Sequence, residues 1–225
     1  MPSAMFTPFR QRDVELRNRV VVSPMCQYSC VEGEATDWHL VHLGARAIGG
    51  AGAVIAEAAA VTPEGRISPA DLGVWRDSHV EPLARIFRFL EEQGVVPAIQ
   101  LAHAGRKAST APPWTGGGPV GPEQGGWNEI LGPSAMAFDS GHQVPTALDR
   151  AGIDRLVAAF AAAAERMLAA GAKIIEIHAA HGYLLHQFLS PLSNRRDDDY
   201  GGSFAGRTRL TREVVAAVRE VWPEH

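Results

Sequence analysis

Two histidines and a tyrosine lie close together in the last quarter of the sequence, at His178, His181 and Tyr183. Two imidazoles can hydrogen-bond one carbonyl or nitro oxygen and spread the negative charge that develops on it. A phenol has a pKa of about 10 in water, so near neutral pH it serves as a proton donor rather than as a base. The three side chains together indicate a site that binds and protonates an electron-poor substrate.

Two other interpretations of the histidine pair stay open. The first is structural, because an isolated pair of histidines is most often buried and hydrogen-bonded within the fold. The second is a metal site, with His186 close by in the sequence. Zinc sites usually need three protein ligands, and no carboxylate or thiolate nearby is an evident third one. We therefore expect no metal.

Polar or reactive side chains also follow three earlier apolar runs of the chain. Taken singly, each has an ordinary explanation: a lone cysteine is most often a small buried hydrophobe. Their placement at the ends of successive apolar runs is what points to chemistry. The groups are Ser23-Pro24-Met25-Cys26 with Tyr28 just beyond, Glu57-Ala58, and Gln100 with His103, Arg106 and Lys107 after it.

Signals for strands and helices alternate along the chain. Short apolar runs at 20–22, 53–57, 97–101 and 173–177 predict four buried strands. A helix is expected from Asp37 to Gly49-Gly50, and three apolar stripes at helical spacing follow. The stripes are Val80, Leu83, Ile86, Phe87 and Leu90; then Ile153, Leu156, Val157, Phe160, Met167 and Leu168; then Leu210, Val214, Val215, Val218 and Trp222.

Four strand-helix units in succession predict parallel strands joined by helical crossovers, and hence the α/β class. A doubly wound sheet and a (β/α) barrel both satisfy this order. No G-x-G-x-x-G motif follows the first strand, which disfavours a dinucleotide-binding sheet. In a barrel the carboxyl ends of the strands meet at one rim, where active sites are built. A barrel would therefore bring the four groups of polar residues together.

The segment 107–148 breaks this rhythm, because it is rich in Gly and Pro and shows no sustained period. Connections longer than about 15 residues are usually functional or disordered. Trp114, Trp127 and Phe138 indicate that the segment packs on something. We expect a lid or side wall over a site; a surface loop or a contact between subunits is the alternative.

The composition excludes several classes of protein. The chain has 225 residues, 46% of them hydrophobic, and a formal net charge of -4, which provides no basic field for nucleic acid or an acidic membrane. Residues 1–12 lack the apolar core of a secretory signal, and no apolar run approaches the roughly 20 residues of a membrane span. Two cysteines are too few for a disulfide framework. These features predict a cytoplasmic protein.

Several long motifs, in order along the chain, resemble the Old Yellow Enzyme family. The resemblance covers essentially the whole chain. The cysteine after Pro-Met resembles the thermophilic-like branch, and the Trp-, Gly- and Pro-rich segment 108–133 resembles its xenobiotic reductases. The motifs are Ser23 to Tyr28, Glu57-Ala58, Gln100 to Lys107, His178 to Tyr183, Ser190 to Arg196 and Asp199 to Ser203.

This resemblance implies a (β/α)8 TIM barrel that holds FMN. It further implies that NADPH or NADH supplies a hydride, which passes through FMN to an activated alkene or a nitro compound. Carried over residue by residue, Ser23, Pro24, Met25, Cys26, Ala58 and Gln100 bind the flavin. His178 and His181 bind the substrate oxygen, Tyr183 donates a proton, Cys26 tunes the flavin and Tyr28 closes the substrate pocket.

The chain supplies about the first four βα units of such a barrel. We expect residues 1–225 to form a single incomplete FMN-binding domain, with 107–148 inserted after the third strand. The flavin phosphate site would then lie outside this sequence, and the chain alone would bind FMN weakly. A fragment of a longer homo-oligomeric enzyme, a half that assembles with another half, and a non-catalytic remnant are the open alternatives. So is the first part of a larger flavoenzyme resembling dienoyl-CoA reductase.

Overall fold

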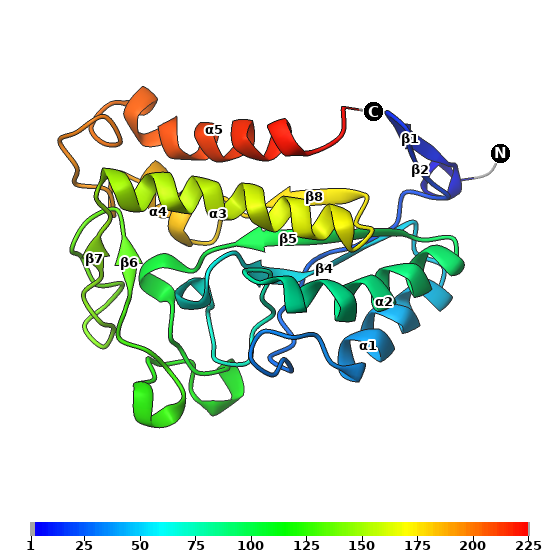
Figure 1. The fold of residues 1–225 in the computed structure, drawn as a ribbon, viewed down its shortest axis with the longest axis horizontal. Helices are drawn as coiled ribbons and strands as arrows, with labels where there is room; N and C mark the ends of the chain where they lie inside the picture. The colour runs from blue at the N-terminus through cyan, green and yellow to red at the C-terminus, as the bar shows by residue number, and fades with distance from the viewer. Residues whose placement is uncertain (1–2, 225) are drawn as a thin grey trace.

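The computed structural model describes residues 3–224, and a four-stranded parallel sheet forms its centre (Figure 1). The strands are β3 (Val21–Val22), β4 (Ala53–Ala60), β5 (Val96–Ala102) and β8 (Ile174–Ile177). Their order in the sheet is β3-β4-β5-β8, the same as their order along the chain. Each strand is thus followed by a crossover to its neighbour, as a barrel requires.

One long helix follows each strand, which confirms the four predicted strand-helix units. The helices are α1 (Asp37–Ile48), α2 (Val80–Glu92), α3 (Arg150–Ala169) and α5 (Phe204–Val221). Side chains cap two of them: Asp149 accepts a hydrogen bond from the Gly152 amide at α3, and Ser203 accepts one from the Gly206 amide at α5. These caps satisfy amide groups that the first helical turn leaves unpaired.

The predicted helix faces are largely buried, with two exceptions. Ile153, Phe160 and Met167 of α3 are fully buried, but Leu168 is 38% exposed. On α5, Val215 is 42% exposed. Each follows a buried stripe residue, Met167 or Val214, by one position, and adjacent residues on a helix point about 100° apart. These two residues were therefore wrong members of the predicted stripes.

Several shorter elements were not predicted. A hairpin of β1 (Phe9–Gln11) and β2 (Val14–Leu16) precedes the sheet, and α4 (Leu184–Leu189) follows β8. Within the long connection 107–148, β6 (Leu131–Gly132) pairs with β7 (Thr146–Ala147). The single-turn 3-10 helices are Ala4–Phe6, Pro63–Gly65, Asp77–His79, Gly105–Lys107, Pro113–Thr115 and Pro122–Gln124.

The main core lies between the sheet and the helices that cover it. Its largest fully buried side chains include Phe87 of α2, Phe160 of α3 and Phe188 of α4. The two edge strands of the sheet are β3 and β8, as expected for part of a barrel. All four residues of β8 are only half-buried, and a groove of about 460 Å³ runs beside this strand, with lining residues from β1, β2 and α5.

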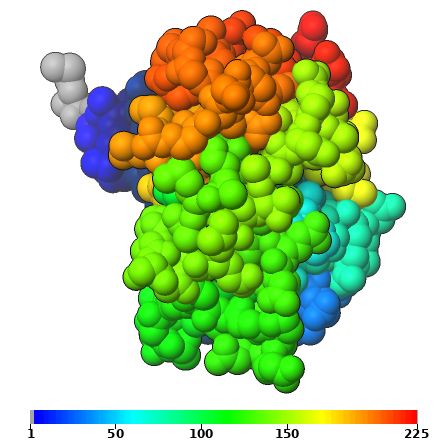
Figure 2. Space-filling view, turned by 90° about the vertical axis from the view of Figure 1, so that its left-hand side faces the viewer, coloured from blue at the N-terminus to red at the C-terminus, as the bar shows by residue number. Residues whose placement is uncertain are grey.

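The long connection 107–148 covers the end of the molecule at which the sheet strands finish. Figure 2 shows this end face-on, with the green segment making up much of the surface and residues 190–205, in orange, above it. Among residues 3–224, no helix combines the length and the apolar character that crossing a bilayer requires.

Candidate active site

The turn after β8 brings His178, His181 and Tyr183 into direct contact. The ring centroids of His178 and His181 lie 5.0 Å apart, and those of His178 and Tyr183 lie 4.9 Å apart, each pair edge to face. His181 and Gly182 have φ angles of 56° and 73°, in the left-handed region. Left-handed backbone is uncommon for histidine and often marks functional sites. The turn uses it to fold the second imidazole back onto the first.

A hydrogen bond from the backbone fixes the tautomer of His178. The Ala180 amide donates to Nδ1 of His178 at 3.2 Å, so the neutral ring carries its proton on Nε2. That nitrogen lies 3.3 Å from Nδ1 of His181. Burial, helped by His181 and His186, lowers the pKa of His178 to about 4. At neutral pH His178 is therefore an uncharged N–H donor at the site.

Tyr183 is held as a protonated phenol. Its pKa is raised by burial and, to a smaller extent, by Cys26, Tyr28 and Asp71. The Lys107 ammonium lies 5.2 Å from the centre of the Tyr183 ring and donates a hydrogen bond to the His181 carbonyl at 3.0 Å. The lysine thus ties the segment after β5 to the turn after β8. Tyr183 keeps its proton near neutral pH and can deliver it to a substrate.

The segment after β3 faces the same site. Ser23 is exposed, Pro24, Cys26 and Tyr28 are half-buried, and Met25 is 50% exposed. Tyr28 has a φ of 50° and packs edge to face against Trp114, with 5.2 Å between ring centroids. Trp114 belongs to the long connection, so this connection reaches the predicted site. Its role as a wall or lid stays a prediction.

Cys26 is a neutral thiol in this environment. Burial raises its pKa, and the carboxyl groups of Asp71 and Glu57 raise it further. A thiolate is the nucleophilic form of cysteine, and groups that raise the pKa suppress it. The surroundings of Cys26 therefore suit a polarizable neutral side chain rather than a covalent catalyst.

Ala58 and Gln100 are opposite each other on neighbouring strands. The prediction that the second strand ends at Glu57-Ala58 was wrong, because β4 continues to Ala60 and its register shifts between Ala56 and Ala58. Gln100 is buried, and its amide nitrogen donates to Glu176 of β8 at 2.5 Å. Among residues 3–224 this bond leaves the Gln100 oxygen and its second N–H available.

Sequence reasoning missed two residues of the site, Asp71 and Glu176, and it named Glu57 as a polar group without giving it a role. Asp71 and Glu57 lie behind Cys26, with Cys26 Sγ and one carboxylate oxygen of each within 4.8 Å of one another. Glu176 was missed because a carboxylate inside an apolar strand run carries no motif. The signal for Asp71 was its place three residues after Ser68, the spacing at which an acidic side chain reaches back to the backbone amide of the serine.

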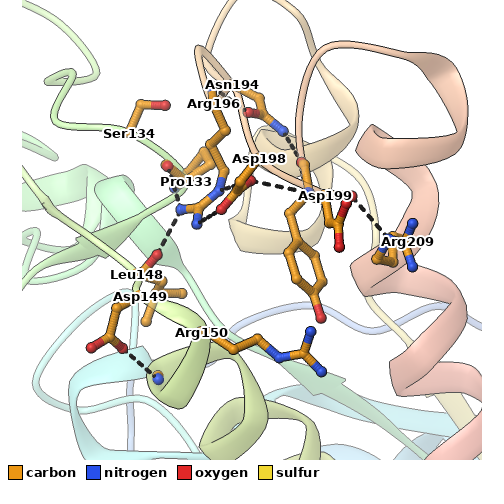
Figure 3. Close-up of polar contacts among 12 residues, drawn as sticks. Pro133, Ser134, Leu148, Asp149, Arg150, Asn194, Arg196, Asp198, Asp199 and Arg209 are labelled. Carbon is orange, nitrogen blue, oxygen red and sulfur yellow. Dashed lines mark hydrogen bonds and ion pairs between the residues drawn. The ribbon is translucent and has the colours of Figure 1, made fainter.

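The motif from Ser190 to Ser203 holds the last part of the long connection, where Pro133 follows β6 and Leu148 follows β7. The Arg196 guanidinium donates to the carbonyls of Pro133, at 3.0 Å, and Leu148, at 2.6 Å, and pairs with both oxygens of Asp198 (Figure 3). Asn194 donates to the Tyr200 carbonyl at 2.8 Å. We call Arg196 and its partners Pro133, Leu148 and Asp198 the Arg196 clamp. Its place is structural, at the base of the long connection.

Comparison with known proteins identifies the family of this chain. The model of the NADH:flavin oxidoreductase / NADH oxidase family matches residues 4–225. The chain belongs to this family. It is 49% identical over 223 residues to the NADH:flavin oxidoreductase FG08077 of Gibberella zeae and 46% identical over 224 residues to the NADPH dehydrogenase of Geobacillus thermodenitrificans. These alignments cover 98% and 99% of the chain.

The solved structures include the Old Yellow Enzyme from Pichia sp. AKU4542, at a TM-score of 0.84 and 29% identity. The match covers 97% of this chain but only 56% of the Pichia chain. This confirms the resemblance to the Old Yellow Enzyme family and the TIM-barrel fold, of which the chain forms the first four βα units. The chain spans 54% and 61% of the length of the two relatives named above.

The residues present fit FMN, the cofactor of this family. The polar edge of a flavin ring offers both hydrogen-bond donors and acceptors, and the Gln100 amide has one free group of each kind among the described residues. Ser23 and Met25 are exposed on the adjoining segment. The assignment of Ser23, Pro24, Met25, Cys26, Ala58 and Gln100 to the flavin stays a prediction, as do the roles of Tyr28, His178, His181 and Tyr183.

Proposed function

We propose that this chain is the flavin- and substrate-binding half of an FMN-dependent ene-reductase. The observation that carries the proposal is the contact of a neutral histidine donor, a second histidine and a protonated tyrosine after β8. When bound, FMN supplies the hydride, which it obtains from NADPH or NADH. The substrate class is an activated alkene, such as an α,β-unsaturated carbonyl, or a nitro compound.

His178 and His181 bind the electron-withdrawing oxygen of the substrate. Nε2 of His178 carries a proton and lies close to Nδ1 of His181. The oxygen of a bound substrate can accept a hydrogen bond from this N–H in place of His181. Because His178 is uncharged, it donates a hydrogen bond without placing a fixed cation beside the flavin. The bond strengthens as negative charge grows on the oxygen, which lowers the barrier to hydride arrival.

Tyr183 protonates the α-carbon of the substrate. Burial and its neighbours keep the phenol protonated, and Lys107 lies over its ring. Tyr28 and Trp114 close the pocket from the other side, and residues 107–148 act as its wall or lid. Cys26, facing the flavin, tunes its potential and the fit of the substrate.

The other half of the barrel belongs against the free edge of β8. The groove of about 460 Å³ beside this strand is lined with apolar side chains, including Ile174 and Ile175, and an unpaired strand edge is a template for another strand. A fifth βα unit would pair there, and later units would hold the flavin phosphate. The free thiols of Cys26 and Cys30 fit a reducing, cytoplasmic setting, and we expect the complete form to be a homo-oligomer.

The test is a titration of the purified chain with FMN, followed by visible spectroscopy. We expect a shifted flavin band but weak retention, because the phosphate site is absent from the proposed half. FMN that stays bound at about one per chain through gel filtration would contradict the half-site interpretation. Adding the remaining four βα units of the Geobacillus relative as a separate polypeptide should tighten binding, and NADPH should then bleach the band under anaerobic conditions.

Recovery of the yellow colour on adding cyclohexenone would show alkene reduction. The double variant His178→Ala, His181→Ala is the matched control: it should still bind FMN but lose the long-wavelength absorbance that a phenol ligand produces over a flavin. A bleached flavin that cyclohexenone cannot reoxidise in the unmodified protein would refute the ene-reductase proposal.

A further inference from the structure

A pair of carboxyl groups lies behind Cys26, on the protein side of the proposed flavin site. Glu57 comes from β4 and Asp71 from the connection between β4 and α2. Cys26 Sγ and one oxygen of each carboxyl group lie within 4.8 Å of one another. Two carboxylates and a thiol this close cannot all carry a negative charge without a large electrostatic cost.

Glu57 is fully occupied by hydrogen bonds that suit its charged form. Its Oε2 accepts from the backbone amide of Gln27 at 2.8 Å, directly after Cys26. Its Oε1 lies 3.0 Å from Nε2 of His39. The Thr36 amide donates to Nδ1 of His39, so the proton of the neutral imidazole is on Nε2 and is donated to Glu57. Glu57 therefore anchors the backbone beside Cys26.

Asp71 has a different set of partners. Its Oδ2 accepts the amide hydrogens of Ile67 and Ser68, at 2.8 and 2.9 Å. Its Oδ1 is buried and has no hydrogen-bond partner among residues 3–224. The Arg66 guanidinium, on the same connection, is occupied by the carbonyls of Pro63 and Pro69. A buried carboxylate oxygen without a partner is costly, and a proton on that oxygen removes the cost.

We propose that Asp71 holds the proton of the Glu57–Asp71 pair and thereby acts as a positioning residue for the Cys26 thiol. Glu57 fixes the backbone beside the thiol, and Asp71 decides whether one or two negative charges lie behind it. The inference deepens the proposed function, since that function assigns Cys26 to the flavin. The reactivity of the Cys26 thiol depends on residues of this chain, so it can be measured without FMN.

The charges around Asp71 support this division of roles. Burial, and after it the charge of Glu57, raises the pKa of Asp71 to about 7, against the two amide donors and Arg66. The other titratable groups at the cluster are Tyr28 and Cys30 from the segment after β3, Tyr183 from the turn after β8 and His39 from α1. The tyrosines and the thiols are uncharged near pH 7 because their pKa values are raised.

Burial thus makes Asp71 a carboxyl group that changes charge close to neutral pH. Below that pH the thiol is backed by one carboxylate. Above it a second carboxylate appears beside the thiol and disfavours the thiolate further. The proton affinity of Cys26, and with it the environment of the flavin face that it contacts, therefore depends on Asp71.

The test is the alkylation rate of Cys26 by iodoacetamide in the full chain, with mass spectrometry to separate it from Cys30. Asp71→Asn keeps an oxygen for the Ile67 and Ser68 amides and reproduces the neutral form of the carboxyl group. At pH 8 we expect alkylation about tenfold faster in this variant, since lowering the thiol pKa by one unit raises the thiolate fraction tenfold. Equal rates, with the far-ultraviolet spectrum unchanged, would overturn the proposal.

Asp13→Asn is the matched control, because Asp13 is an exposed aspartate near the N-terminal hairpin. It should leave the rate unchanged. The unmodified chain supplies a second test that needs no variant. Its alkylation rate should rise less than tenfold per pH unit between about pH 6.5 and 8, where Asp71 ionises, and regain a tenfold rise above that. A constant tenfold rise per unit across the whole range would refute the inference.

These outcomes are separate from those of the flavin titration. A chain that binds no FMN, alone or with the second half of a relative, would refute the proposed function and leave the alkylation result standing. A chain that binds FMN but shows equal Cys26 reactivity in the two proteins would refute only the role of Asp71.

Discussion

Asp71 and Asp198 show two opposite ways of placing an aspartate in this protein. Both accept hydrogen bonds from backbone amides, Asp71 from Ile67 and Ser68 and Asp198 from Tyr200. Asp198 also pairs with the Arg196 guanidinium, which holds the pKa of its carboxyl group below the ordinary value. Asp71 is buried without such a cation, and its pKa is raised to about 7.

The difference separates a structural region from a reactive one. In the Arg196 clamp the charges of Arg196 and Asp198 are paired with each other. The two carbonyls that Arg196 binds belong to the buried residues Pro133 and Leu148. At the candidate active site, groups are held in less favourable forms: a neutral histidine, a buried acid and a residue with a left-handed backbone. Strained backbone and perturbed pKa values, which lower stability, commonly occur together at functional sites.

Replacing Arg196 should produce the largest effect on stability. Arg196→Ala leaves the Pro133 and Leu148 carbonyls without their donor and releases the two chain segments that follow β6 and β7. At about 1 to 3 kcal/mol for each unpaired group, the free energy of unfolding should fall by about 4 kcal/mol. Urea denaturation followed by circular dichroism measures this. Arg195→Ala, on the exposed neighbour, should cost less than about 0.5 kcal/mol; similar losses in both variants would show that the clamp is not specific.

Asp71 should make the stability depend on pH in the opposite sense to a paired aspartate. Its folded pKa lies above the unfolded one, so the folded state binds the extra proton and stability is lost as the pH rises toward 7. At 1.36 kcal/mol per pKa unit, the loss between pH 5 and 8 should be about 2 to 3 kcal/mol. Denaturation curves across this range measure it, and Asp71→Asn should flatten the dependence. Parallel curves for the two proteins would remove the distinction between Asp71 and Asp198.

Tyr183 should matter little for stability and much for chemistry. No hydrogen bond of its hydroxyl is made within residues 3–224, so Tyr183→Phe should change the free energy of unfolding by less than about 0.5 kcal/mol. In the flavin-loaded, complete protein it should slow alkene reduction more than the reduction of the flavin by NADPH. Stopped-flow measurement of the two half-reactions separates these steps. Equal slowing of both would exclude Tyr183 as the proton donor.

Much of the fold and part of the site were predictable from local pattern. The four strands lie within a few residues of their predicted positions, because strands of a parallel sheet are continuous apolar runs. The prediction that all four are buried holds for β4 and β5 but was wrong for β3 and β8, which are the partly exposed edge strands. The contact of His178, His181 and Tyr183 was predictable because all three belong to one short turn. The end of the second strand was not, because the register shift near Ala58 depends on pairing with β5.

The sequence by itself determined the order of strands and helices, the family and the side chains that could bind an electron-poor substrate. Only the tertiary structure decided which of these side chains carry charge. Glu57 and Asp71 are ordinary acidic residues in the sequence. Glu57 is held near Cys26 by a histidine and one backbone amide, whereas Asp71 is buried with two backbone amides and no free cation beside it among the described residues, which raises its pKa. Desolvation and distance arise from contacts between residues far apart in the chain, and no local motif encodes them.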